Sequence, residues 1–367
     1  MNIKSKIQEE CLKAIENKRY AGAILGTGAG KTLLGLKHMS EIYHDSISYL
    51  VVAPKVSIFQ EWKEQAIKFG LEYLLEHINF STYLSLSKQN IKLYDQVYLD
   101  ECHNLKSKHA VWLDKFPGNV LGLTGTYPRN TRSESYMVCN TYCPKVYEYD
   151  VEEAIKDNML NDYKIYVHCL TLSRNKCIPV GNNGLMSEVD VYYMWEKKLS
   201  QASGAKLQLA RIMRMKAIQN FNTKVIYARR LLREQTEKTL VFADYSEQAD
   251  RICQHSYHSK NKESKNNLEL FKDGTIDKLS SVLQLAEGIN IPNLKVGIIM
   301  HSYANEKKLR QKIGRFLRLN PTETCIIHLL CYENTVDIKW AKEALKDFDK
   351  NKIFKYHEEP KRINIIQ

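Results

Sequence analysis

Hydrophobic and polar residues follow two distinct periods along the first third of the chain. Residues 3–18 place Ile7, Cys11, Leu12 and Ile15 on one face, which is the spacing of an amphipathic helix. Apolar runs and helical periods then alternate, at residues 20–26, 31–43, 48–54, 57–70, 96–104 and 119–129. Continuous apolar runs are typical of strands buried on both faces. The pattern therefore predicts an open, parallel α/β sheet over residues 20–130, with helices on both sides.

The alternation stops over residues 140–210 and then resumes. A long, basic helical period at 206–235 is followed by the apolar run KTLVFAD at 238–244. We expect further strands at 280–285, 295–300 and 324–331 and further helices at 246–256, 305–319 and 335–348. The chain thus divides into a first lobe over 1–145, a connector over 146–205, a second lobe over 206–350 and a basic tail over 351–367.

Composition fits a soluble protein, and the positive net charge suggests either a polyanionic partner or a solvated basic surface. The 367 residues are 44% hydrophobic and 26% charged, with no apolar run long enough to cross a membrane and no apolar leader. Nine scattered cysteines are expected to stay reduced in a cytoplasmic compartment. The net charge of +12 favours a polyanionic partner, since cationic side chains release its counterions, or else a solvated basic surface.

The stretch GTGAGKT at 26–32 lies between a predicted strand and a predicted helix. In that setting backbone amides and the start of the helix bind phosphate, although a plain glycine-rich turn has the same composition. The expected cradle consists of Thr27, Gly28, Ala29 and Gly30. We expect Lys31 to reach the β- and γ-phosphates of ATP and Thr32 to bind Mg²⁺. Leu25 stands where the general pattern has another glycine.

The stretch YLDECH at 98–103 delivers two acids to the end of a predicted strand. Ligands of parallel sheets bind at this edge, so Asp100 is expected to hold Mg²⁺ and Glu101 to polarise a water molecule. Paired acids alone are often a solvated turn. Their place about 70 residues after the glycine-rich stretch supports the functional interpretation.

Together these stretches resemble the motifs of a superfamily 2 helicase of the DExH type. The resemblance rests on GTGAGKT (26–32), VVAPKVSIFQEW (51–62), STYLSL (81–86), DECH (100–103), LTGTYPR (123–129), KTLVFADYSEQADRI (238–252), SSVLQLAEGINIPNLKVGII (280–299) and QKIGRFLR (311–318). It implies two RecA-like lobes in tandem, with ATP in the cleft between them. Lys312 replaces a frequent arginine of the family, and Asn290 replaces a common aspartate.

The resemblance also implies roles for residues far from the glycine-rich stretch. Gln8 resembles the glutamine that reads adenine, and Gly288 and Asn290 fall in a motif expected to contact the cofactor. Arg315 and Arg318, with Gln311, would reach the γ-phosphate and stabilise charge during hydrolysis.

Nucleic acid is the implied partner. The residues expected to contact its backbone are Pro54, Lys55, Thr82, Tyr83, Tyr245, Ser280 and Ser281. Hydroxyls and backbone amides contact phosphates without reading bases, which suits a motor that moves on any sequence. Thr82 and the two serines are equally ordinary strand-end residues. The basic segment 206–235 adds electrostatic grip or is a solvated face.

We therefore expect an ATP-dependent DNA helicase or translocase, acting as a monomer on single-stranded or branched DNA in a bacterial or phage-infected cytoplasm. The motif details resemble DNA repair and phage recombination helicases. An RNA helicase, a nucleic-acid-binding ATPase without strand separation, a small-molecule phosphate-loop enzyme and a non-enzymatic binding module stay open as alternatives. Cysteine spacing gives a weak indication of zinc at Cys139, Cys143, Cys169 and Cys177.

Overall fold

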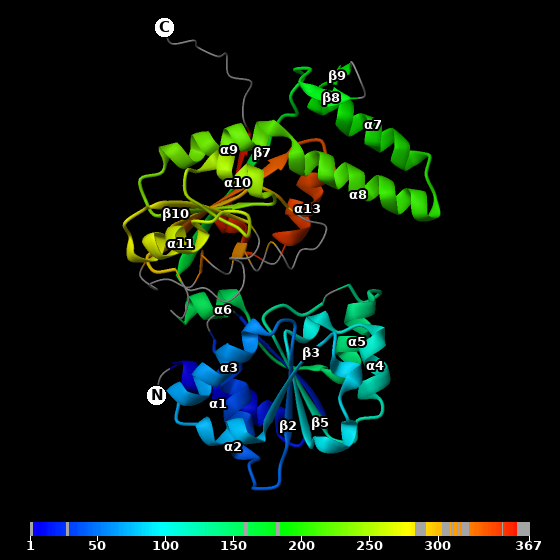
Figure 1. Cartoon of the computed structure of the whole chain (residues 1–367), viewed down its shortest axis with the longest axis vertical. Coiled ribbons are helices and arrows are strands. Elements are labelled where there is room, and N and C mark those ends of the chain that lie inside the picture. The colour runs from blue at the N-terminus through cyan, green and yellow to red at the C-terminus, as the bar shows by residue number, and fades with distance from the viewer. Residues whose placement is uncertain are drawn as a thin grey trace. The chain divides into compact units, whose positions relative to one another are not determined.

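The chain forms two compact units, residues 1–160 and 161–367. A computed structural model describes residues 3–26, 29–128, 130–157, 161–180, 184–282, 291–302, 309, 312–313, 316–317, 323–346 and 348–357. Each unit is built on its own parallel sheet (Figure 1). The expected pair of α/β lobes is therefore confirmed.

The first unit contains a six-stranded parallel sheet in the order β3-β2-β4-β5-β1-β6. Its strands are β1 (Tyr20–Leu25), β2 (Tyr49–Ala53), β3 (Ile78–Thr82), β4 (Gln96–Asp100), β5 (Asn119–Thr124) and β6 (Lys145–Tyr149). Every residue of β2 and β4 is buried, as the continuous apolar runs predicted.

Helices cover both faces of this sheet (Figure 1). One face carries α1 (Ile3–Ile15), α2 (Lys31–Glu41) and α3 (Ser57–Lys68); the other carries α4 (Ser107–Leu113) and α5 (Glu134–Tyr142). The side chains of α4 and α5, among them Trp112 and Tyr142, share one core cluster with β4 and β5. The short α6 (Val151–Lys156) follows β6.

The second unit contains a seven-stranded parallel sheet in the order β11-β12-β10-β13-β14-β7-β15. Its strands are β7 (Asp162–Leu170), β10 (Thr239–Ala243), β11 (Ser256–Tyr257), β12 (Lys278–Val282), β13 (Val296–Ile299), β14 (Thr324–Tyr332) and β15 (Ile353–His357). A separate antiparallel hairpin joins β8 (Ile178–Val180) and β9 (Gly184–Met186). The helices described here are α7 (Glu188–Ser200), α8 (Gly204–Asn220), α9 (Asn222–Glu234), α10 (Ser246–Ile252), α11 (Ser264–Asp273) and α13 (Val336–Ala344).

The structure divides the chain differently from the sequence pattern. Residues 146–205, expected to be a connector, supply most of β6 to the first sheet and all of β7 to the second. Residues 353–357, expected to lie in a tail, form β15 and pair with β7. Local patterns could not show this, because strand pairing joins segments that lie far apart in the sequence.

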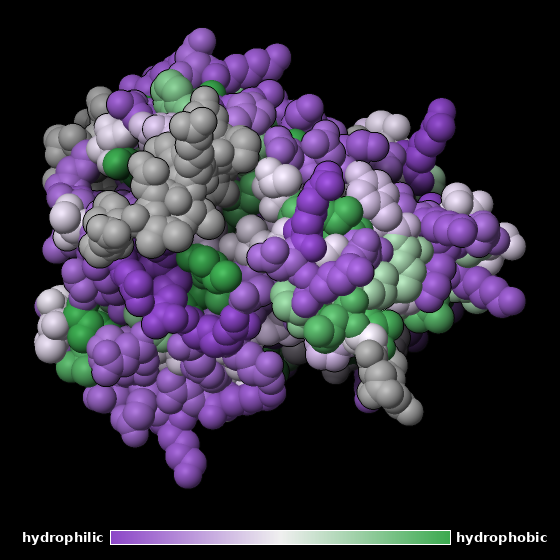
Figure 2. Space-filling view, turned by 90° about the horizontal axis from the view of Figure 1, so that it is seen from above, coloured by the Kyte–Doolittle hydropathy of each residue, from purple (hydrophilic) through white to green (hydrophobic). Residues whose placement is uncertain are grey.

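The long basic helix expected at 206–235 is two helices. Phe221 separates α8 from α9 with extended backbone angles, φ −62° and ψ 139°, and its side chain is buried in the core. α9 lies on the sheet, while α8 runs beside α7 away from it (Figure 1). Exposed apolar side chains occur on this projection, including Tyr193, Leu209 and Ile212. Figure 2 shows a largely hydrophilic surface with a hydrophobic area on that side.

Candidate nucleotide site of the first unit

The glycine-rich turn joins β1 to α2. Gly26 at the end of β1 donates its amide to the carbonyl of Tyr149 at 3.0 Å, and α2 begins at Lys31. Gly30 between them has φ 81°, a left-handed conformation that glycine adopts without strain. The turn therefore presents the start of a helix at the carboxyl edge of the sheet, where its amides attract an anion. Thr27 and Gly28 of the predicted cradle lie outside the described residues.

Gln8 of α1 lies against this turn. Its side chain is 1% exposed, and its Nε2 donates to the carbonyls of Ala29 and Gly30, both at 3.4 Å. A Cβ atom on Gly30 would lie 2.9 Å from the same Nε2 and 2.8 Å from Cε of Lys4. The structure thus gives Gln8 a contact with the cradle, while its reading of adenine stays a prediction.

Lys31 and Glu101 come together although 70 residues separate them. Lys31 begins α2, and Glu101 follows β4, two strands away from β1 in the sheet. Their charged groups, Nζ and Oε1, are 4.0 Å apart, and both side chains are mostly shielded from solvent. A Cβ atom on Gly125, in the stretch LTGTYPR, would lie 3.4 Å from Lys31 Nζ. Three of the predicted motifs therefore meet at one ammonium group.

Asp100 is held by a side chain that the sequence analysis did not single out. Its carboxylate Oδ2 accepts a hydrogen bond from the indole Nε1 of Trp62 on α3 at 2.9 Å. Its backbone carbonyl accepts from the hydroxyl of Tyr83 at 2.8 Å. Apolar spacing on α3 indicates only that Trp62 faces the core, so no sequence signal reveals this contact.

Glu101 has a network of its own. Its backbone is left-handed, with φ 50°, which is unusual for a residue with a side chain. Its Oε2 accepts from the Thr124 hydroxyl at 3.3 Å and lies 3.2 Å from Nδ1 of His103. That nitrogen is also within hydrogen-bond distance of the hydroxyls of Thr124 and Thr126, at 2.8 and 3.3 Å. The DECH and LTGTYPR stretches are thus one polar network.

The two neighbouring carboxylates have opposite pKa shifts. Burial and the adjacent charge of Glu101 raise the pKa of Asp100 to about 6, against the Trp62 hydrogen bond and the Lys31 charge. Burial also disfavours the ionised Glu101, but Lys31 and His103 outweigh it and lower the pKa of Glu101 to about 2. The raised pKa shows that the ionised form of Asp100 is disfavoured where it lies, and the lowered pKa shows that Glu101 stays ionised.

These residues fit ATP with Mg²⁺. The start of α2 and the Lys31 ammonium suit phosphate, and the Asp100 carboxylate with the Thr32 hydroxyl supplies the oxygen ligands that Mg²⁺ prefers. Thr32 is half-buried in the first turn of α2. The buried Asp100, next to a second carboxylate, supports this assignment independently, since a bound cation would relieve the repulsion.

The predicted arginine pair cannot be placed. Gln311, Arg315 and Arg318 lie outside the described residues, as do Gly288 and Asn290. Lys312 of the same stretch is fully buried, with its Nζ 3.8 Å from Oδ1 of Asp244. The roles of the arginines and a nucleotide site shared by two lobes stay predictions.

The residues predicted to bind nucleic acid are exposed to very different degrees. Lys55 is exposed and Pro54, Thr82 and Tyr245 are partly exposed. The Tyr245 hydroxyl donates to Oε1 of Gln219 at 3.1 Å. Their contacts with nucleic acid stay predictions.

For Tyr83, Ser280 and Ser281 the structure corrects the expectation. Tyr83 is 6% exposed, and its hydroxyl is bound to Asp100. Both serines have no exposed surface, because they lie in the buried middle of β12, where successive side chains point to opposite covered faces of the sheet. Their hydroxyls donate to backbone carbonyls, that of Ser280 to Ala249 at 2.7 Å and that of Ser281 to Val282 at 2.8 Å. These side chains hold the fold and are not placed to touch a phosphate.

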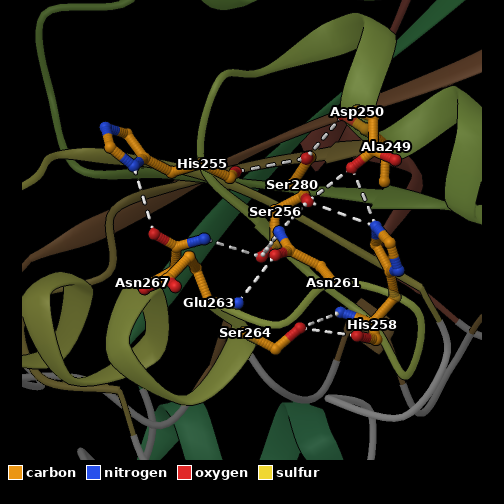
Figure 3. Close-up of polar contacts among 10 residues, drawn as sticks. All are labelled: Ala249, Asp250, His255, Ser256, His258, Asn261, Glu263, Ser264, Asn267 and Ser280. Atoms are coloured by element: carbon orange, nitrogen blue, oxygen red, sulfur yellow. Dashed lines mark hydrogen bonds and ion pairs between the residues drawn. The ribbon is translucent and has the colours of Figure 1, made fainter.

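Ser280 belongs to a polar network that the sequence did not indicate (Figure 3). Ser256 and His258 lie beside Asp250. Serine, histidine and aspartate are the three residue types of a serine-nucleophile catalytic site. The geometry excludes that role, because Ser256 Oγ and His258 Nε2 both bind the same oxygen, Oδ1 of Asp250, at 2.6 and 2.8 Å. Ser256 is also 1% exposed. The network fixes β11 and the start of α11, where Asn267 donates to the Ser256 carbonyl at 3.0 Å.

The structure does not support a zinc site. Cys139 and Cys143 are buried in the first unit, while Cys169 and Cys177 belong to the second. Within the described residues no group of three or more histidine, cysteine, aspartate or glutamate side chains is arranged to hold a metal ion. Across the same part of the chain, no helix is both long and apolar enough to span a membrane.

Family models match both units. "Type III restriction enzyme, res subunit" matches residues 3–129, and "Helicase conserved C-terminal domain" matches residues 211–320. The first segment contains Lys31, Asp100 and Glu101, and the second contains Arg315 and Arg318. The two matches, one in each unit, support a superfamily 2 helicase core.

Two known proteins are similar to this chain over most of its length and over most of their own length. The "DNA 3'-5' translocase XPB2" of Sulfurisphaera tokodaii is 26% identical over 380 residues, covering 93% of this chain and 85% of that protein. Among solved structures, Dbp5 of S. cerevisiae bound to RNA and ADP BeF3 has a TM-score of 0.56 and 13% identity, covering 96% of this chain and 89% of that one.

Restriction enzymes share the same fold. The "ATP-dependent Type ISP restriction-modification enzyme LlaBIII bound to DNA" has a TM-score of 0.61 and 12% identity. The match covers 98% of this helicase core but only 32% of that much longer chain. A fragment of a putative HsdR subunit from Vibrio vulnificus has a TM-score of 0.61 and 16% identity, with 96% and 67% covered. At these identities the structures establish the RecA-like fold of both units and nothing more specific.

Proposed function

We propose that this helicase core hydrolyses ATP to move along DNA, and that branched or single-stranded DNA of repair or recombination is its substrate. The observation that carries the proposal is the meeting of Lys31, Asp100 and Glu101 at one edge of the first sheet. The similarity to a DNA translocase over 93% of the chain supports DNA as the polymer. The basic charge of the chain, +12, suits a polyanionic track.

The chemistry follows from the geometry of the first unit. The Lys31 ammonium and the amides that begin α2 bind the phosphates and offset the charge that develops on them. Bound Mg²⁺ would neutralise phosphate charge, held by Asp100 and Thr32. Glu101, ionised by its low pKa and fixed by Thr124 and His103, orients a water molecule for attack. Because the same network includes Thr126, a change at the phosphate reaches the stretch LTGTYPR directly.

The test is steady-state ATPase at low salt with no nucleic acid, single-stranded DNA, forked DNA, a Holliday junction and RNA. We expect branched DNA to stimulate turnover most. Lys31→Ala should lower the stimulated rate by about a hundredfold or more, since it removes a charge that acts on the transferred phosphoryl group. Lys37→Ala, on the same helix α2 and partly exposed, is the matched control and should keep most of the rate.

Two outcomes would contradict the proposal. Stimulation by RNA alone would make the chain an RNA helicase. No stimulation by any nucleic acid would leave a binding module or an enzyme acting on a small substrate.

A further inference from the structure

Trp62 is buried against α2, the helix that begins at Lys31. The side chain is fully buried on α3, and a Cβ atom on Gly35 of α2 would lie only 2.5 Å from its Cη2. The ring also meets Tyr98 edge-on, with 6.2 Å between the ring centroids. Only a glycine at position 35 leaves this space. The indole is therefore wedged between the helix that starts with Lys31 and the strand that ends with Asp100.

The packed indole of Trp62 fixes the direction of the Asp100 carboxylate. The indole Nε1 donates to Oδ2 at 2.9 Å, and the Tyr83 hydroxyl donates to the Asp100 carbonyl at 2.8 Å. Tyr83 is itself fixed, because its amide donates to the Ala53 carbonyl at 3.3 Å. One donor thus holds the side chain of Asp100 and the other holds its main chain.

The kind of donor matters for the charge of the site. Indole and phenol are neutral, so they hold the side chain and the main chain of Asp100 without cancelling the negative charge of its carboxylate. A lysine or arginine in the same place would neutralise Asp100 and compete with a divalent cation. With Oδ2 held by Trp62, Oδ1 would be the oxygen left to bind a cation.

We propose that Trp62 and Tyr83 are positioning residues of the magnesium site, which hold Asp100 so that one carboxylate oxygen faces the metal. The proposal rests on the proposed function, because it assumes that Asp100 serves Mg²⁺ bound with nucleotide. It adds two residues whose hydrogen bonds have no part in the predicted motif roles. Partners of this kind around a metal ligand typically change metal affinity by about ten- to a hundredfold.

The experiment compares Trp62→Phe with Trp112→Phe. Both changes keep a buried aromatic ring and remove an indole donor in the first unit. In Trp112 that donor binds the Gln89 carbonyl at 2.8 Å and has no contact with Asp100. The measurement is the affinity of a fluorescent, non-hydrolysable ATP analogue without DNA, by anisotropy under direct excitation of the analogue. Each protein is titrated once with Mg²⁺ and once with excess EDTA.

We expect Trp62→Phe to weaken binding in Mg²⁺ by about tenfold and to leave binding in EDTA unchanged. Trp112→Phe should leave the affinity for the analogue unchanged both in Mg²⁺ and in EDTA. Tyr83→Phe should act in the same direction as Trp62→Phe with a smaller effect, and it decides the matter if Trp62→Phe does not fold.

Other results would overturn the inference. If Trp62→Phe and Tyr83→Phe bind the analogue as the unaltered protein does, or lose affinity equally with and without Mg²⁺, their role is packing alone. If the unaltered protein binds no analogue in either condition, the proposed function fails and the inference fails with it. The ratio of the affinities in Mg²⁺ and in EDTA therefore distinguishes failure of this inference from failure of the proposed function.

Discussion

At the residue scale, the surroundings of a side chain decide its chemistry more than its type does. Asp100 and Glu101 are adjacent carboxylates, yet the pKa of one is raised to about 6 and that of the other is lowered to about 2. Asp100 meets a neutral indole, whereas Glu101 meets an ammonium and an imidazole. This separation fits the proposed roles, metal binding for Asp100 and water orientation for Glu101.

Gly30 gives a prediction at the same scale. Gly30→Ala should lower the free energy of unfolding by about 1 kcal/mol, the usual cost of a left-handed backbone for a residue with Cβ. It should also weaken ATP binding, because the new Cβ would displace Gln8 and Lys4. Urea denaturation and nucleotide titration measure the two effects.

Gly70→Ala is the matched control for that prediction. Gly70 also has a positive φ, 68°, but a Cβ there would meet nothing within 4 Å. It should lose similar stability and keep nucleotide affinity. Equal nucleotide affinity in both variants would show that the Gln8 contact has no part in binding.

At the element scale, the junctions between helices and sheet rest on buried charge. Glu188 at the start of α7 is 2% exposed and accepts from the amides of Ser173 and Thr223 at 3.0 and 2.9 Å. Lys224 in α9 is fully buried and its Nζ donates to Oδ2 of Asp337 in α13 at 2.5 Å. These contacts hold α7, α9 and α13 to the second sheet.

The Lys224–Asp337 pair yields the element-scale prediction. Lys224→Met should destabilise the second unit by about 3–5 kcal/mol, because it leaves the Asp337 carboxylate buried without its cation. Urea denaturation followed by circular dichroism measures the loss. Lys272→Met breaks the exposed pair with Glu269, 2.8 Å long, and should cost less than about 1 kcal/mol. Equal losses in the two variants would contradict the importance of burial.

At the scale of the whole molecule, buried histidines set the response to acid. Burial lowers the pKa of His38 and His168 to about 4 and of His301 and His328 to about 3, from an ordinary value of 6.5. Between pH 6.5 and 4 the unfolded chain therefore binds protons that the folded chain does not. Stability must fall as pH falls through this window.

We expect the free energy of unfolding to decrease from pH 7 to pH 5, by on the order of 1 kcal/mol for each of these histidines, and the urea midpoint to decrease with it. Asp100 and Glu41 oppose this, because their raised pKa values let the folded state bind a proton first. Ordinary carboxylates titrate mostly below this range, so the histidines dominate it. A midpoint that is unchanged or higher at pH 5 would contradict the prediction.

Much of the fold and part of the site could be predicted from local pattern. The buried strand β2 is a continuous apolar run, and GTGAGKT lies between a strand and a helix as expected. The pairing of Lys31 with Glu101 also follows, because parallel strands present their carboxyl ends at one edge. Exposure could not be predicted in the same way. Ser280 and Ser281 are residue types that often contact phosphate, but both are fully buried in the second sheet.

The sequence by itself determined the two α/β lobes and the order of the motifs, and it predicted the residues that would bind phosphate, since these depend on period and spacing along the chain. Only the tertiary structure decided that β7 and β15 complete the second sheet, that Phe221 separates α8 from α9, and that Trp62 and Tyr83 hold Asp100. The physical reason is that hydrogen bonds and packing form between segments distant in sequence. The Trp62 indole reaches the Asp100 carboxylate only because a glycine on another helix makes room for it.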